Sequence, residues 1–164
     1  MGIFSRKQKL TPQFHDDDFG VYMRDLDGFP ATVMVNLTVH EMAPVPALPY
    51  FFTLHVPYPL QKQSGLPTEE QLHRLQRIEG IARDVAGTTV PHRHAMSVTH
   101  NGTRSIGFYV PSQRSLREFD ATLLSRLGAD AEELGFTEYD DPAWASYLED
   151  VYPQPHEYAQ MKQY

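Results

Sequence analysis

The 164-residue sequence contains no cysteine. A chain without thiols cannot form a disulfide, a cysteine-ligated zinc ribbon or a cysteine nucleophile. It also lacks an apolar run long enough to cross a bilayer, and no signal-peptide core follows its first residues. These absences predict a soluble protein of the reducing cytoplasm that makes no contact with a membrane.

Basic residues are scarce: 14 Lys and Arg stand against 21 Asp and Glu, which gives a net charge of −7. An acidic surface repels phosphate backbones, so we expect no nucleic-acid partner. The sequence also lacks a Gly-x-Ser-x-Gly elbow, a Walker loop, a dinucleotide fingerprint and a His-Glu-x-x-His zinc motif. We therefore expect no cofactor and lean towards a function other than catalysis.

Hydrophobic residues make up 41% of the chain and include nine Phe, nine Tyr and one Trp, enough for the core of a single domain. Alternating apolar residues predict strands at 19–23, 32–39 and 50–56. A turn at 27–28 separates the first two strands, and the proline-rich stretch 43–49 separates the second from the third.

A long helix is predicted to begin after Thr68, whose hydroxyl can form a capping box with Gln71. Gly87 is expected to end it. Glu79 and Arg83 have the spacing of an ion pair on the helix surface. The apolar stripe that we expect to face the core comprises Leu72, Leu75, Ile78, Ala82 and Val85.

A β-hairpin is predicted around Asn101 and Gly102. A two-residue turn would pair Val98 with Ser105 and mix polar with apolar side chains on each face. A three-residue loop with Gly102 left-handed would pair Val98 with Arg104. Because burial of one face fixes the register, we favour the three-residue loop. It places on one side Met96, Val98, Ile106, Phe108 and Val110.

A second helix is predicted to open with a capping box between Ser115 and Glu118 and to end at Gly128, before a strand at 136–139. The order of elements from residue 50 onward is then β-α-β-β-α-β, as in the ferredoxin-like arrangement. The predicted fold is α+β: an antiparallel sheet with two main helices on one face, extra N-terminal strands and a short C-terminal helix. The predicted domain covers 19–153, between a disordered segment 1–18 and a mobile tail 154–164.

Three groups of residues carry a family resemblance: Leu66-Pro67 before the long helix, Gly102-Thr103-Arg104 followed by Phe108-Tyr109, and the stretch 141–147 ending at Tyr152-Pro153. From Phe19 to Pro153 the chain resembles the bacterial domain-of-unknown-function 695 family. The resemblance implies a bacterial origin. Members of the family are sometimes joined to domains resembling the regulator of ribonuclease activity B. The resemblance transfers no catalytic residue.

Arg104 is a candidate binding residue, because it follows a glycine turn and could clamp a carboxylate or phosphate with its guanidinium fork. In the alternative, which we favour, its stem covers the rim of the core and its head pairs with an acidic residue of the protein.

His92 and His94 lie two residues apart on a predicted strand, and His100 has the same parity, a spacing that can chelate a metal. Apolar residues share that face, so the histidines could instead fill the margin of the sheet. No carboxylate at a fixed spacing completes a ligand set, and we predict that no metal is bound.

Trp144 and Tyr147 are candidate binding residues on the short last helix, for which Asp141 is the expected N-cap and Pro142 the first residue. Large aromatic residues dominate protein–protein hot spots. We favour the alternative that they dock the helix onto the core, in an apolar stripe of Trp144, Tyr147, Leu148 and Val151.

The function that these observations favour is a non-catalytic domain that binds and regulates another, unidentified protein. The alternative is a small enzyme, or a small-molecule-binding or metal-binding domain, that uses the sheet face near Arg104, His92 and His94. A deep pocket with a polar lining would favour the alternative, and a flat apolar patch would favour the protein-binding function.

Overall fold

The computed structural model describes residues 17–163. Only the last two residues of the predicted disordered segment 1–18 are among them, and the rest of that segment lies outside the described residues. The Asp17 carboxylate accepts a hydrogen bond from Arg93 at 2.7 Å, and the Asp18 N–H donates to the hydroxyl of Thr38 at 2.7 Å. Both residues therefore contact the folded domain.

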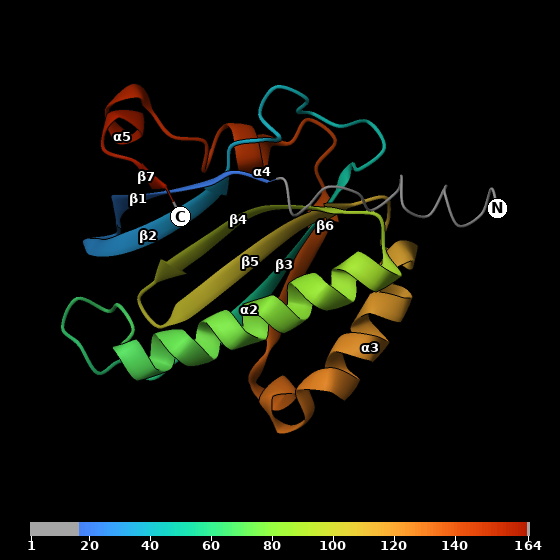
Figure 1. The fold of residues 1–164 in the computed structure, drawn as a ribbon, viewed down its shortest axis with the longest axis horizontal. Coiled ribbons are helices and arrows are strands. Elements are labelled where there is room, and N and C mark those ends of the chain that lie inside the picture. Colours follow the sequence, from blue (N-terminus) through green and yellow to red (C-terminus); the bar gives the residue numbers. More distant parts are fainter. Residues whose placement is uncertain (1–16, 164) are drawn as a thin grey trace.

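One antiparallel sheet organises the chain, with the strand order β6-β3-β5-β4-β2-β1-β7. Helices α2 (Glu69–Thr89) and α3 (Arg117–Leu127) cover one face, and α4 (Ala145–Leu148) and α5 (Pro155–Ala159) lie on the other (Figure 1). The α+β class and the antiparallel sheet are thus confirmed. The strands are β1 (Phe19–Leu26), β2 (Phe29–Asn36), β3 (Tyr50–Pro57), β4 (Arg93–His100), β5 (Thr103–Val110), β6 (Gly135–Asp140) and β7 (Lys162–Gln163).

Strands β3 and β4 lie on either side of β5, and α2 connects them across the sheet. The N-terminal hairpin of β1 and β2 extends the sheet beyond β4. Its turn at Asp27 and Gly28, both with positive φ, is the predicted one. Strand β2 ends at Asn36, three residues earlier than predicted, because the chain then turns: the His40 N–H donates to the Leu37 carbonyl, and the Met42 N–H donates to the Val39 carbonyl.

Helix α2 begins with the predicted capping box: the Gln71 N–H donates to the Thr68 hydroxyl at 3.2 Å, and the Thr68 N–H donates to the Gln71 side chain at 2.9 Å. Gly87 does not end the helix, which continues to Thr89. The stop comes at Val90, whose backbone is extended, because Pro91 disfavours a helical conformation in the residue before it.

The β4–β5 hairpin has the two-residue turn, so the predicted three-residue loop is wrong. Thr99 lies opposite Arg104 and Val98 opposite Ser105, with Asn101 and Gly102 both at positive φ. Only the left-handed conformation of Gly102, at φ 97°, is confirmed. Ile106 and Phe108 therefore pack under the helices, and Met96 packs on the opposite face of the sheet.

The start of α3 also differs from the prediction. Ser115 exchanges hydrogen bonds with Ser112 and belongs to a 3-10 turn, Arg114–Leu116, so the Ser115–Glu118 capping box does not form. Gly128 ends α3 as predicted, with φ 58°, and opens a second 3-10 segment, Gly128–Glu133.

The segment 154–163, predicted as a tail outside the domain, is instead part of the fold. It forms α5 and then β7, which pairs with β1. The Glu157 carboxylate receives two hydrogen bonds from the Arg24 guanidinium, at 2.8 and 2.9 Å. This ion pair fastens α5 to the sheet.

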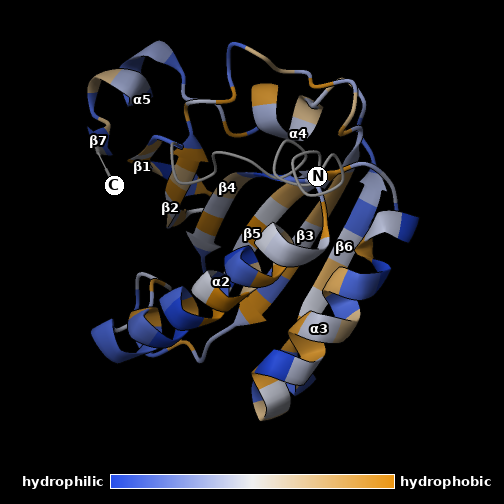
Figure 2. Cartoon of the chain, turned by 45° about the vertical axis from the view of Figure 1, so that its right-hand side comes forward, coloured by the Kyte–Doolittle hydropathy of each residue, from blue (hydrophilic) through white to orange (hydrophobic). Residues whose placement is uncertain are grey.

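Both faces of the sheet bury a core. Apolar residues, orange in Figure 2, run along β3 and β5, the strands between the two layers. The helix-side core includes Phe52, Leu54, Leu75, Ile78, Ile106, Phe108, Phe119 and Leu123. The second core, on the α4 side, includes Tyr22, Val33, Val35, Phe51, Met96, Tyr109, Trp144 and Tyr147.

Candidate functional site

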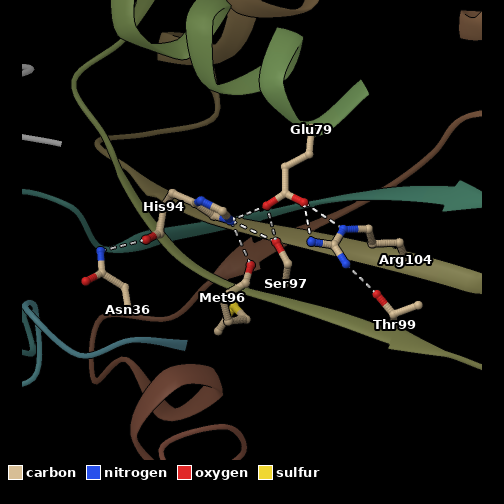
Figure 3. Close-up of polar contacts among 7 residues, drawn as sticks. All are labelled: Asn36, Glu79, His94, Met96, Ser97, Thr99 and Arg104. Carbon is tan, nitrogen blue, oxygen red and sulfur yellow. Dashed lines mark hydrogen bonds and ion pairs between the residues drawn. The ribbon is translucent and has the colours of Figure 1, made fainter. Parts of the chain in front are cut away.

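A network of polar side chains is buried between α2 and the sheet. Glu79 descends from α2 and pairs with Arg104 of β5: its Oε1 lies 2.6 Å from Nε and 2.5 Å from Nη2 (Figure 3). The third guanidinium nitrogen, Nη1, donates to the Thr99 hydroxyl at 2.6 Å. Arg104 is only 5% exposed. The prediction that its head pairs with an acid of the protein is confirmed.

His94 completes the network from the other end. The Ser97 hydroxyl donates to Glu79 Oε2 at 2.8 Å, and His94 Nε2 lies 2.9 Å from that hydroxyl and 3.1 Å from the Met96 carbonyl (Figure 3). Because a carbonyl can only accept, Nε2 carries a proton. Burial lowers the pKa of His94 to about 4, so the imidazole is neutral near pH 7. His94 therefore orients the network and offers no exposed base.

The charges of the network are fixed by its surroundings. Burial alone would raise the pKa of Glu79, but the Arg104 guanidinium and the Ser97 hydroxyl hold that pKa below its ordinary value. Burial lowers the pKa of His94 to about 4. Near neutral pH the network consequently holds one carboxylate, one guanidinium and one neutral imidazole, and it has no net charge.

The structure does not bring His92, His94 and His100 together as the ligands of one metal ion. His92 and His94 contact the ring of Phe108, with centroids at 5.9 and 5.0 Å. A bulge at Ala95 reverses the parity of the strand, so His100 lies on the opposite face, where its Nε2 donates to the Leu26 carbonyl at 2.8 Å. Within residues 17–163, no three His, Asp or Glu side chains gather in a way that could hold a metal ion.

Trp144 and Tyr147 are anchors of the α4 layer. Trp144 is fully buried, stacks on Tyr109 at 3.9 Å, and donates from its indole nitrogen to the Leu48 carbonyl at 2.8 Å. Tyr147 is also buried and donates to the Asn36 carbonyl at 2.6 Å. The docking interpretation is confirmed, and neither side chain is available to a partner in this conformation.

The local structure that carries these anchors is not the predicted helix. Pro142 does not open a helix, because Trp144 adopts a left-handed conformation at φ 57° and α4 begins only at Ala145. The Asp141 carboxylate accepts from the N–H groups of Ala145 and Ser146, at 2.9 and 3.0 Å. It also accepts from the Tyr109 hydroxyl at 2.7 Å, so Asp141 joins α4 to the sheet.

Glu79 is the central residue that sequence reasoning missed. Its spacing to Arg83 indicates a surface pair, yet it lies on the buried face of α2. The signal is in the helical period: Glu79 follows Leu75 by four residues and precedes Ala82 by three. An acid inside an apolar stripe requires a buried cation, and Arg104 was the basic residue expected among apolar neighbours.

On the α4 side, the sheet has a shallow hollow of about 190 Å³. Its floor is at Gly107, where a Cβ atom would lie 2.8 Å from the Phe51 ring. Tyr139 of the edge strand β6 forms one wall and is 42% exposed. The other lining residues include Thr53, Met96, Val98, Ser105, Ser146, Asp150 and Val151.

A second hollow, of about 200 Å³, reaches the rim of the buried network. Thr99 and Arg104 line it together with Lys62 from the loop before α2. Since Glu79 already neutralises Arg104, Lys62 contributes the unbalanced charge of this hollow. The site is therefore a weak anion site at most, and it contains no side chain activated as a nucleophile or general base.

The geometry defines a class: an α+β domain with a central sheet that packs against helices on both faces and a buried Glu79–Arg104 ion pair beneath α2. The chain matches the model of the family described as "Family of unknown function (DUF695)" over residues 17–161, and it belongs to that family. No curated protein and no solved structure matches it. Among residues 17–163, no helix is long and apolar enough to span a membrane.

Proposed function

We propose that this chain is a non-catalytic, protein-binding domain that receives an extended segment of another protein along β6. The observation that carries the proposal is the apolar hollow beside an edge strand. Addition of a strand to a sheet edge supplies main-chain hydrogen bonds, and a neighbouring pocket selects the side chain.

The edge itself supports this function. Strand β6 pairs with β3 on one side, and no strand within residues 17–163 pairs with its other side. Two of its six residues are large and exposed, since Phe136 and Tyr139 are each 42% accessible. An edge with unpaired backbone groups and exposed aromatic side chains is a template for a further strand.

The hollow supplies specificity. It is lined mainly by apolar atoms of Phe51, Met96, Val98 and Tyr139, and an aliphatic side chain would fill much of its 190 Å³. Two exposed acids flank the hollow: Asp140 is the last residue of β6, and Asp150 lines the hollow itself. The matching partner segment therefore carries one apolar residue with basic residues beside it.

The alternative, an enzyme or small-molecule site around Arg104, His92 and His94, has less support. Arg104 is paired with Glu79, His94 is buried and neutral, and His92 is also buried. The hollow beside Arg104 offers a single unbalanced charge, from Lys62.

We further propose the following domain organisation, location and role. Residues 17–163 act as one domain, the protein is a bacterial cytoplasmic one, and partner binding regulates that partner. The ferredoxin-like description applies to β3 through β6, supported by the order β6-β3-β5-β4 with α2 and α3 on one face. The family's association with domains resembling the regulator of ribonuclease activity B also supports a regulatory function.

Site-specific photocrosslinking tests the partner surface. A benzoylphenylalanine in place of Tyr139 should crosslink one dominant polypeptide in cells, and a Val98→Glu substitution, at a half-buried position in the hollow, should abolish that product. Benzoylphenylalanine in place of Met23 is the matched control, because Met23 is 48% exposed on β1, which four strands separate from β6 in the sheet. Equal products from the two positions, or none from Tyr139, would refute the proposal. A product twice the mass of the chain would identify the partner as a second copy.

A further inference from the structure

A second surface, formed by residues that do not line the β6 hollow, has the composition of a cation-binding site. It is a hollow of about 410 Å³ where the turn after β2 meets the segment between α4 and α5. Three ring side chains line it, namely His40, Tyr152 and Tyr158, and two carboxylates, Asp18 and Glu41.

The rings are arranged as a partial cage. His40 stacks on Tyr152 with centroids 3.7 Å apart and planes 13° apart, and Tyr158 lies 6.5 Å from Tyr152 at 52°. Tyr158 is 49% exposed, so its ring is open to a ligand. The faces of tyrosine rings carry negative potential and attract alkylammonium and guanidinium groups within about 6 Å.

The carboxylates are not used by the fold. In the part of the chain that the structure describes, no basic side chain forms an ion pair with Asp18 or Glu41, and no lysine or arginine lines the hollow. By contrast, Asp17, next to Asp18, pairs with Arg93, and Glu157, next to Tyr158, pairs with Arg24. Within residues 17–163, these two carboxylates and the exposed ring of Tyr158 therefore leave a negative potential that a cation would neutralise.

The walls of the hollow are held in place before any ligand arrives. The Asp18 N–H donates to the Thr38 hydroxyl at 2.7 Å, and the Tyr152 N–H donates to the Tyr147 carbonyl at 2.8 Å. Tyr158 is positioned by α5, which the Arg24–Glu157 pair fastens to β1. A preorganised site loses less conformational entropy on binding.

We propose that this hollow binds an organic cation, an alkylammonium or guanidinium group, against the exposed ring of Tyr158 and beside the carboxylates of Asp18 and Glu41. The group could be carried by a free amine or by a basic side chain of a polypeptide, and both share this chemistry. The site is independent of the partner surface at β6.

Calorimetric titration with choline, and separately with the amide of Nα-acetyl-arginine, tests the site. We expect a Kd on the order of 1 mM or tighter for at least one of them. The uncharged analogue of choline, 3,3-dimethylbutan-1-ol, should bind at least tenfold more weakly. Tighter binding of the arginine amide would indicate a polypeptide ligand, and tighter binding of choline a free amine.

Single substitutions locate the binding. Glu41→Gln and Tyr158→Leu should each weaken it by roughly three- to tenfold, because each removes one attraction from an exposed position without touching the core. Glu149→Gln and Tyr139→Leu are the matched controls, an exposed acid and an exposed tyrosine outside this hollow. Equal losses in the controls, equal binding of the uncharged analogue, or no heat with either cation would overturn the proposal.

The chain's own basic N-terminal residues, Arg6, Lys7 and Lys9, are potential competitors. A full-length variant with all three replaced by Gln should bind the cations at least as tightly as the native chain. Tighter binding in that variant would support the site and identify these residues as its competing ligand. Because the β6 crosslink does not depend on Glu41 or Tyr158, failure of one proposal is distinguishable from failure of the other.

Discussion

The two faces of the sheet bury polar groups in different ways. On the helix side, the groups are side chains that satisfy one another, as in the Glu79–Arg104 pair with Thr99, Ser97 and His94. On the α4 side, aromatic side chains donate mainly to backbone carbonyls: Trp144 to Leu48, Tyr147 to Asn36 and Tyr22 to Val151. The helix side depends on charge balance, and the α4 side depends on the shape of large rings.

The two layers also differ in how much they cover. Helices α2 and α3 form a continuous layer over β3 and β5, because 21 and 11 residues of helix lie along them. Helix α4 has only four residues, so part of the α4-side face between β6 and β4 remains open as the hollow. The incomplete layer is therefore where a binding surface can exist.

The largest effects should come from breaking the helix-side pair. Glu79→Ala leaves the buried Arg104 guanidinium without its counter-charge, and we expect a loss of about 3–5 kcal/mol in the free energy of unfolding, measured by urea titration. The double variant Glu79→Leu/Arg104→Met removes both charges. It should be more stable than Glu79→Leu alone and than Arg104→Met alone, each of which leaves one buried charge unpaired. Additive losses in the double variant would show that the pair is not coupled.

An effect of similar size is expected on the α4 side. Trp144→Ala should cost about 3–5 kcal/mol through lost burial and the cavity it leaves. Trp144 is the only tryptophan, so native emission should be blue-shifted and protected from acrylamide. Tyr158→Ala is the control: this ring is 49% exposed, and its loss should change the unfolding midpoint little. Red-shifted emission with an unchanged midpoint for Trp144→Ala would contradict the anchor role.

The helix-side network should also make the free energy of unfolding depend on pH, through His94. The folded pKa of His94 is about 4, against an ordinary value of 6.5, so between these values only the unfolded chain binds the proton. Stability from this group is complete above pH 6.5 and falls as the pH drops, by roughly 1.4 kcal/mol per pH unit. The lowered pKa of Glu79 adds a further loss below its ordinary value of 4.5.

Urea titrations from pH 7.5 to 4.5 measure this slope. His94→Gln should flatten it, and His73→Gln, at an exposed position on α2, should leave it unchanged. His55 and His92, whose pKa values burial also lowers, should retain part of the slope in the His94 variant. An unchanged slope in His94→Gln would show that the network is not what titrates.

The smallest effect concerns the β4–β5 turn, which sets the register of the hairpin and therefore which of its side chains pack under α2 and α3 and which pack on the α4 side. Gly102 has φ 97°, so Gly102→Val should cost about 1–2 kcal/mol, and Gly102→Asn less, since asparagine tolerates positive φ. Thermal melting of the two variants measures the difference. Equal melting temperatures would mean that the turn does not strain a side chain at this position.

Several features were predictable because their causes are local. Alternation set β3, the Thr68–Gln71 capping box set the start of α2, and Gly128 set the end of α3. The stripe of Trp144, Tyr147, Leu148 and Val151 was sufficient to predict a docked segment. In each case, neighbours within a few residues supply the hydrogen bond or the apolar period.

What the tertiary structure decided was the pairing of distant residues. The β4–β5 register could not be chosen from alternation, because both faces of that hairpin are buried and each mixes polar with apolar side chains. The helical period puts Glu79 on the buried face of α2, but only the tertiary structure identifies its counter-charge, Arg104, 25 residues away in sequence. The segment 154–163 joins the fold through Arg24, 133 residues from Glu157. The sequence by itself determined β3, the start of α2 and the end of α3, because their signals are short-range. Long-range charge pairing and burial decided which face each residue contributes to and whether the C-terminal segment joins the sheet.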